Sequence, residues 1–320
     1  MKKRGVFQLA TLLVLGLGAL FSLFAFDNAA FWQRQEQLEI SVIIREADST
    51  GWASARQGME QAAGDLGAEL RFLTLGRANN VEEQKTLLAR EVEGGADGVV
   101  LVPVNPQQMA EDVRQAAGQT AVVTMESDMR ENGAAAFVSV DNAAMGRALA
   151  GQALQRLAAG DAVVLLDSLP GGTGVSARVD AAEQQLAAAG CAVYRYTADD
   201  TQKIAEVLKG AVAERAPAAV LVFDTPGTEQ AAAAAEGLAN PPLLYGTGAT
   251  SAVIAYLEQG TLEEIAAQNE FAAGYLAVQA AVQAAQKKRS SPVEPLEFFL
   301  VNRQNMGEAA NQKVLFPVTR

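Results

Sequence analysis

The sequence contains no histidine and only one cysteine, Cys191. These absences exclude catalysis by Ser-His or Cys-His pairs and most structural zinc sites, because each needs residues that the chain lacks. A single cysteine has no partner within the chain, so no disulfide framework can form even in an oxidising compartment. Since apolar residues flank Cys191, we expect it to lie in the core.

Basic and aromatic residues are also scarce. Lys and Arg number 25 against 37 Asp and Glu, which gives a net charge of −12, and no basic stripe reverses this locally. Such a chain repels phosphate backbones, so binding to nucleic acid is excluded. Half of the 320 residues are nevertheless hydrophobic. That is enough for one large or two medium domains with buried cores.

The N-terminus has a membrane-targeting pattern. Basic residues at 2–4 precede an apolar run from Val6 to Phe26, which is about the length that spans a bilayer core. The charges favour a cytoplasmic N-terminus. We expect a single-pass protein of the cell membrane, with a cytoplasmic tip, a transmembrane anchor over about 6–26 and a short stalk within 1–33, and an extracytoplasmic domain over 34–320. A cleaved signal peptide is the alternative, although its apolar region is usually shorter.

From Glu39 onward, short β-branched runs alternate with Ala-rich helical stretches, a pattern typical of parallel strands joined by crossover helices. Strands are predicted at 40–44, 68–73, 98–103, 120–125, 135–140, 162–166, 192–196, 218–223 and 242–246. The stretch from Asp65 to Val102 has a counterpart from Ala189 to Phe223. This weak repeat favours an α/β fold with two doubly wound lobes over one continuous sheet.

In open parallel sheets, ligands bind beyond the carboxyl ends of the strands. Several loops at such ends carry carboxylates, amides, an arginine and an aromatic side chain, which are the groups that a sugar pocket needs. The predicted ligand-binding residues at these ends are Glu46, Asp48, Trp52, Glu126, Ser127, Asp141, Arg178, Asp224 and Thr247.

Four of these residues have competing interpretations. Arg178, which opens a predicted helix, could be a solvated surface residue. Trp52 could be a core residue, and Asp224 could be a plain helix cap. Asp141 and Asn142 could each cap the following helix, and we predict that Asp141 is the one nearer the ligand.

The order of several motifs resembles the ribose-binding-protein family of type I periplasmic sugar-binding proteins over about residues 38–320. The run Gly94–Pro103 (GGADGVVLVP) resembles the family's third-strand signature, and Val138–Asn142 (VSVDN) is similar to another of its motifs. Arg178 precedes a helix as the family's ligand-binding arginine does, and Gln268 is similar to its hinge glutamine. The resemblance therefore adds Gln268 to the predicted ligand-binding residues, although a plain hinge hydrogen bond would also explain it.

The resemblance implies the type I periplasmic-binding-protein fold, with two lobes joined by three hinge crossovers. One lobe would hold about residues 38–140 and 269–296, and the other about 141–268 and 297–320. The crossovers are expected near Val140-Asp141, Gln268-Asn269 and 295–298. Closure of the lobes around a ligand would then be the signal that a partner protein reads.

The sequence departs from typical pentose binders of this family at the ligand positions. Glu126-Ser127 stands where Asp-Arg is usual, Thr247-Gly248 replaces a Phe-Asp pair, and Asp224 replaces an asparagine. These changes put ribose itself in doubt. The C-terminal run Lys313–Pro317 and the expected anchor resemble a membrane-tethered branch of the family that is often associated with sensing.

We therefore predict an extracytoplasmic solute-binding protein that captures a small polar ligand, a sugar or a related polyol. Its partner would be an ABC transporter permease, for uptake, or a membrane histidine kinase, for sensing; a sensor subunit for a non-sugar ligand is an alternative. A hydrolase acting on a glycoside is disfavoured. The Gly-rich run Pro170–Gly174 resembles neither a nucleophile elbow nor a Walker loop and is interpreted as a flexible connection. No enzymatic activity and no cofactor are expected.

Overall fold

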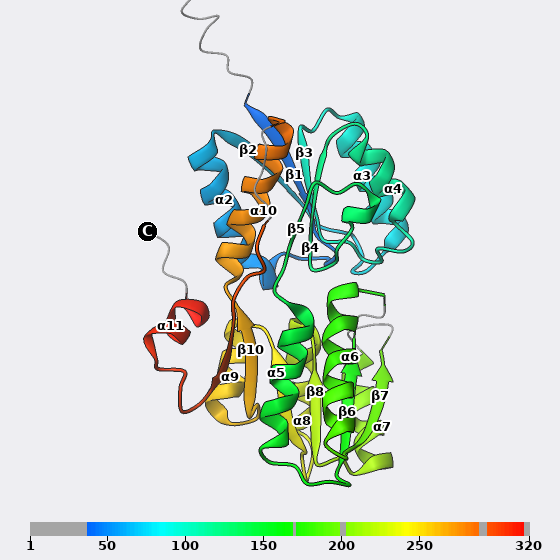
Figure 1. Ribbon diagram of the computed structural model, residues 1–320, viewed down its shortest axis with the longest axis vertical. Helices are drawn as coiled ribbons and strands as arrows, with labels where there is room; N and C mark the ends of the chain where they lie inside the picture. Colours follow the sequence, from blue (N-terminus) through cyan, green and yellow to red (C-terminus); the bar gives the residue numbers. More distant parts are fainter. Residues whose placement is uncertain (1–36, 169–170, 199–202, 288–292, 317–320) are drawn as a thin grey trace, which may run out of the picture. The chain divides into compact units, whose positions relative to one another are not determined.

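The computed structural model describes residues 37–168, 171–198, 203–287 and 293–316 (Figure 1). The predicted membrane anchor over about 6–26 lies outside these residues. Within the described part, no helix combines the length and the apolar character that crossing a bilayer requires. Residues 38–320 form one unit, and it contains two β-sheets.

The first sheet has five parallel strands in the order β2-β1-β3-β4-β5. They are β1 (Leu38–Ile43), β2 (Ala68–Leu73), β3 (Gly98–Leu101), β4 (Ala121–Met125) and β5 (Ala136–Val138). The helices of this lobe are η1 (Thr50–Trp52), α2 (Ala53–Leu66), α3 (Val81–Glu93), α4 (Ala110–Ala117), η2 (Arg130–Asn132) and α10 (Glu270–Ala285). In Figure 1, α2 and α10 lie side by side on one face of the sheet, and α3 and α4 cover the other.

The second sheet has six strands in the order β11-β10-β9-β8-β6-β7, and only β11 runs antiparallel to its neighbour. They are β6 (Ala162–Asp167), β7 (Ala192–Thr197), β8 (Ala219–Val222), β9 (Leu243–Thr247), β10 (Glu264–Gln268) and β11 (Phe298–Asn302). The helices are α5 (Asn142–Leu154), α6 (Thr173–Ala188), α7 (Ile204–Arg215), α8 (Thr225–Ala235), α9 (Ser251–Gln259) and α11 (Ala309–Leu315).

The chain changes sheet at three places. It leaves the first sheet between β5 and α5, returns between β10 and α10, and leaves again between α10 and β11. At the first and third of these passages, Val140 and Leu296 form an isolated parallel bridge, and the Leu296 amide donates to the Ser139 carbonyl at 2.9 Å. Two separate sheets joined in this way form the two-lobed α/β fold that the sequence predicts.

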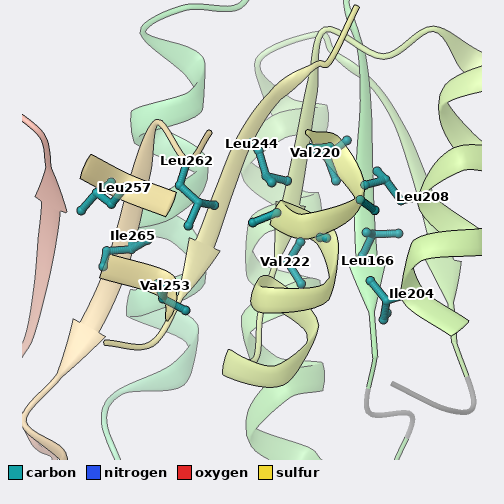
Figure 2. Close-up of a cluster of buried hydrophobic side chains, with 14 of the residues drawn as sticks. Leu166, Ile204, Leu208, Val220, Val222, Leu244, Val253, Leu257, Leu262 and Ile265 are labelled. Atoms are coloured by element: carbon teal, nitrogen blue, oxygen red, sulfur yellow. The ribbon is translucent and has the colours of Figure 1, made fainter. Parts of the chain in front are cut away.

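Each sheet is buried on both faces, which explains why its inner strands are nearly continuous apolar runs. The edge strands β2 (AELRFL) and β7 (AVYRYT) are partly exposed and carry polar residues. Figure 2 shows one of the four buried clusters, where Leu166, Val220, Val222 and Leu244 of the second sheet meet Ile204 and Leu208 of α7. A second cluster covers the opposite face of that sheet and includes Cys191. The expectation that Cys191 is a core residue is therefore confirmed.

Glycines allow two helix pairs to approach closely. A Cβ atom added at Gly58 of α2 would lie 2.0 Å from the Phe271 carbonyl oxygen of α10, and one at Gly274 of α10 would lie 1.9 Å from the Ala55 oxygen. Gly146 of α5 meets the Arg178 carbonyl of α6 in the same way, at 2.1 Å. No side chain fits at such distances, so these glycines determine how near the helices lie to one another and to the sheet.

Candidate ligand-binding cleft

A cleft of ≈ 1650 Å³ lies at the carboxyl ends of strands from both sheets. Its walls come from the segments after β1, β2, β3, β4, β8, β9 and β10, from the first turns of several helices that follow them, and from residues of α5, α6 and α11. This is where open parallel sheets place their ligands. The cleft is larger than the roughly 300–1,000 Å³ of sites that enclose a small ligand, so the lobes must approach each other to surround one.

Arg45, two residues beyond β1, is buried in the wall of the cleft, with 4% of its surface exposed. Its Nε donates to Glu46 Oε1 at 3.1 Å, and its Nη2 lies 3.2 Å from Glu126 Oε2. Its Nη1 is buried without a hydrogen-bond partner. Although burial disfavours the charge, Glu126 and Glu46 raise the pKa of the guanidinium above its usual value. Arg45 therefore places a charged hydrogen-bond donor in the wall of the cleft.

Glu46 connects Arg45 to the aromatic side chain of the cleft. While Oε1 accepts from Arg45, Oε2 accepts from Trp52 Nε1 at 2.9 Å. Trp52 is buried at the end of η1 and lines the cleft. Burial raises the pKa of Glu46, and the neighbouring Arg45 opposes that rise. Because both of its oxygens are engaged, Glu46 orients Arg45 and Trp52.

Glu126 follows β4 in a left-handed backbone conformation, with φ at +62°. Non-glycine residues rarely adopt this region, and outliers of this kind cluster at functional sites. Its carbonyl oxygen faces α6, where a Cβ added at Gly174 would lie only 2.1 Å from it. Next to this contact, the Thr173 amide donates to Ser127 Oγ at 3.2 Å. The end of β4 in one lobe therefore touches the start of α6 in the other.

Arg178 projects from the second turn of α6 into the cleft wall and is buried. Its Nε donates to Asn142 Oδ1 at 2.7 Å, and its Nη1 donates to the Phe223 carbonyl at 2.9 Å. Burial lowers the pKa of the guanidinium, and the carboxylates of Glu126 and Glu270 oppose this. Asn142 also donates to Ser139 Oγ at 3.0 Å, so α5 holds Arg178 in place.

Several buried polar atoms of the cleft wall have no partner. Asp224 caps α8 by accepting from the Gly227 amide at 2.8 Å through Oδ1, but its Oδ2 accepts nothing. The hydroxyl of Thr247 at the end of β9 and the Oε1 atom of Gln268 at the end of β10 are also unpartnered. Burial without a partner is costly, because the group has lost water and gained nothing. Among the described residues, five of the seven buried side-chain atoms without a partner belong to residues that line the cleft, and the other two are on Thr124 and Ser168.

Glu270 begins α10 directly after the hinge and lines the cleft. Its Oε1 accepts from Gln268 Nε2 at 3.0 Å. Burial raises the pKa of this carboxyl to about 7, with a further contribution from the nearby negative charge of Glu126. The Glu270 carboxyl group therefore gains or loses its proton near neutral pH.

A sequence profile described as "Periplasmic binding protein domain" matches residues 40–289. The chain belongs to this family. Among solved structures, this periplasmic binding protein is similar to a carbohydrate-transporter solute-binding protein from Agrobacterium radiobacter in complex with D-arabinose, with a TM-score of 0.81 and 18% identity over 88% of this chain and 99% of the other. A glucose-galactose binding protein, GanP, from Geobacillus stearothermophilus has a TM-score of 0.78 at 18% identity, over 85% and 100% of the two chains.

A structure described as the XylFII-LytSN complex also matches, with a TM-score of 0.76 at 16% identity, over 84% of this chain and 98% of that one. At such identities these likenesses establish the type I fold. No curated protein matches the chain.

The structure brings most of the predicted ligand residues of this periplasmic binding protein to one cleft. Those that line it are Glu46, Asp48, Trp52, Glu126, Arg178, Asp224, Thr247 and Gln268. Two others are elsewhere. Asp141 is exposed and caps α5 by accepting from the Ala144 amide at 2.8 Å, whereas its neighbour Asn142 is the residue that holds Arg178. Ser127 is buried in the contact with Thr173 and does not line the cleft.

The sequence interpretation missed Arg45 and Glu270. Arg45 follows Ile43-Ile44 directly, and a charged residue at the carboxyl end of a buried strand is a signal that could have found it. Glu270 resembles a common acidic residue in the first turn of a helix, where it would favour the helix dipole. The Gly-rich run, interpreted as a flexible connection, differs too, because Gly172–Gly174 begin α6 and contact the other lobe; Pro170 lies outside the described residues.

Proposed function

We propose that this protein is an extracytoplasmic solute-binding protein that captures a small polyhydroxylated ligand, a sugar or a related polyol, between its two lobes. The observation that carries this is the set of unpartnered buried polar atoms in one cleft, namely Arg45 Nη1, Ser54 Oγ, Asp224 Oδ2, Thr247 Oγ1 and Gln268 Oε1. The set mixes donors, acceptors and hydroxyls that do both, as the hydroxyls of a sugar require. Trp52 adds an aromatic wall of the kind that contacts the apolar face of a sugar ring.

The proposal includes a role for the N-terminal segment. Residues 6–26 would anchor the protein in the cell membrane, and the domain over 34–320 would lie on the extracytoplasmic side. Bound sugars in the A. radiobacter relative and the two-protein XylFII-LytSN assembly support two downstream roles, delivery to an ABC permease or signalling to a membrane kinase. Retention of the native protein in membrane fractions after a salt wash would support the anchor, and a soluble form that begins after residue 25 would overturn it.

The test of ligand binding starts with a thermal-shift panel of sugars and polyols on the domain from residue 34, followed by calorimetry of each hit. Arg178→Ala removes charge-assisted hydrogen bonds worth about 1.5–3 kcal/mol, so affinity should fall at least tenfold. Arg156→Ala is the control, because Arg156 is exposed, pairs with Glu263 and lies outside the cleft. Equal affinity for wild type and Arg178→Ala would remove Arg178 from the site, and a panel without hits would overturn the sugar class. Product analysis after incubation with glycosides tests the alternative of a hydrolase.

A further inference from the structure

The charges that line the cleft do not balance. Among the described residues, seven carboxylates face it, on Glu46, Asp48, Glu82, Glu126, Asp224, Glu229 and Glu270, against three guanidinium groups, on Arg45, Arg77 and Arg178. No lysine lines it. Burial raises the pKa of Glu46, Asp224 and Glu270, but the other four carboxylates alone outnumber the guanidinium groups. A ligand that carries a carboxylate or a phosphate would add to this excess, so the cleft favours a neutral or a positively charged ligand.

The two buried arginines leave part of this negative charge without a partner. Arg45 forms ion pairs with Glu46 and Glu126, and Arg178 donates to an amide and a carbonyl oxygen instead of a carboxylate. Asp224 and Glu270 form no ion pair within 4.0 Å in the part of the chain that the structure describes.

Of these two carboxylates, Asp224 is the more deeply buried. Only 5% of the surface of Asp224 is exposed, and its Oδ2 atom accepts no hydrogen bond. The hydrogen-bond donor to Glu270 is the neutral amide of Gln268. Buried carboxylates are normally paired with cations or fully hydrogen-bonded, because a bare buried charge is costly. Asp224 has no cation in ion-pair contact, and Arg45 and Arg178 attract it only from farther away. Glu270 is half-buried, and Arg178 acts on it in the same way.

We propose that the ligand is an aminated sugar or polyol whose protonated amine supplies the missing cation, bound by the carboxylate cluster of Glu126, Asp224 and Glu270. This inference rests on the proposed function and narrows its ligand class. Both Asp224 and Glu270 interact electrostatically with Glu126 and Arg178, so a single positive charge near Glu126 acts on all three carboxylates. The guanidinium groups remain available to the hydroxyls of the ligand.

The pH dependence of binding separates an amine from a neutral ligand. Glu270 faces Gln268 from β10, Glu126 from the end of β4 and Arg178 from α6. Its raised pKa, about 7, means that the carboxylate gains its charge between about pH 6 and 8. An alkyl amine, like that of lysine, stays protonated to about pH 10. Affinity for the amine should therefore rise over this interval, whereas affinity for the matched alcohol should not.

The experiment compares matched pairs that differ only in an amine or a hydroxyl, by calorimetry on the full-length chain in detergent. The probes are 1-amino-1-deoxysorbitol against sorbitol, and 6-amino-6-deoxyglucose and 6-amino-6-deoxygalactose against their parent hexoses. We expect the amine to bind at least tenfold more tightly in at least one pair. Glu270→Gln and Asp224→Asn should each reduce that preference at least threefold, and Asn remains a good helix cap for α8. Glu258→Gln, an exposed site on α9 outside the cleft, should leave it unchanged.

Each outcome decides something. Tighter binding of the neutral member in every pair would overturn the amine while leaving the sugar-binding function intact, and no binding of either member together with an empty panel would overturn that function too. An amine preference that survives both substitutions, in variants that melt as cooperatively as wild type, would show that the carboxylate cluster does not bind the amine. Loss of the rise in affinity between pH 6 and 8 in Glu270→Gln supports the assignment.

Discussion

Replacing Glu126 by alanine and by glycine gives two variants that lack the same carboxylate and differ only in Cβ. The backbone of Glu126 is left-handed, with φ at +62°. For a residue with a Cβ atom this conformation costs about 1–2 kcal/mol, whereas glycine adopts it freely. The structure therefore predicts that Glu126→Gly is the more stable of the two, which reverses the usual order.

The size of the difference follows from two opposing effects. Glycine relieves the left-handed strain but loses about 0.4–1 kcal/mol through the greater freedom of its unfolded chain. The expected advantage of Glu126→Gly over Glu126→Ala is therefore about 0.5–1 kcal/mol in the free energy of unfolding. Both variants break the ion pair with Arg45 at 3.2 Å, so that loss cancels in the comparison, and both should bind ligand equally weakly.

Urea unfolding of both variants, followed by circular dichroism, measures this difference. The control is the same pair of substitutions at Glu111, an exposed residue in the first turn of α4. There glycine should be the less stable, by about 0.5–1 kcal/mol. If Glu126→Ala proves more stable than Glu126→Gly by a similar amount, the left-handed conformation at this position is wrong, and so is the strain that we connect with the cleft.

Two further predictions concern stability. The pKa of Glu270 is raised to about 7 from its usual 4.5, so the folded state holds a proton that the unfolded state releases; ligand-free protein should become more stable as the pH falls from about 8 to 5, by at most roughly 3 kcal/mol. Thermal melts across this range should show the trend weakened in Glu270→Gln, and an identical profile would contradict it. Gly58→Ala forces a Cβ against the Phe271 carbonyl at 2.0 Å and should cost about 1–3 kcal/mol. Gly64→Ala in the same helix, with no atom within 4 Å of the new Cβ, should be neutral or stabilising, and equal melting temperatures for the two would refute the close approach of α2 and α10.

The strands of both lobes could be predicted because burial on both faces produces unbroken apolar runs. Val99–Leu101 and Val220–Val222 are examples, and both are fully buried. No strand was predicted at β10 or β11. The β10 segment contains Ala266 and Ala267, which have low strand propensity, and β11 pairs only at the edge of its sheet.

The cleft could be predicted in outline, because the carboxyl ends of parallel strands meet at one edge. Its details depend on packing that the sequence does not encode locally. Asp141 and Asn142 are neighbours of similar chemistry, and the direction in which α5 leaves the hinge decides that the first is an exposed cap and the second holds Arg178. The pairing of Arg45 with Glu126 joins residues about eighty positions apart, and no local pattern predicts it.

The central claim is that a ligand is bound between two lobes that close around it. Small-angle scattering of the domain from residue 34, with and without a saturating ligand found in the panel, tests this most directly. Contacts divided between Trp52 and Glu126 in one lobe and Arg178 and Asp224 in the other favour the closed state. We predict a smaller radius of gyration with ligand. An unchanged radius, with binding verified by calorimetry in the same sample, would contradict capture by closure.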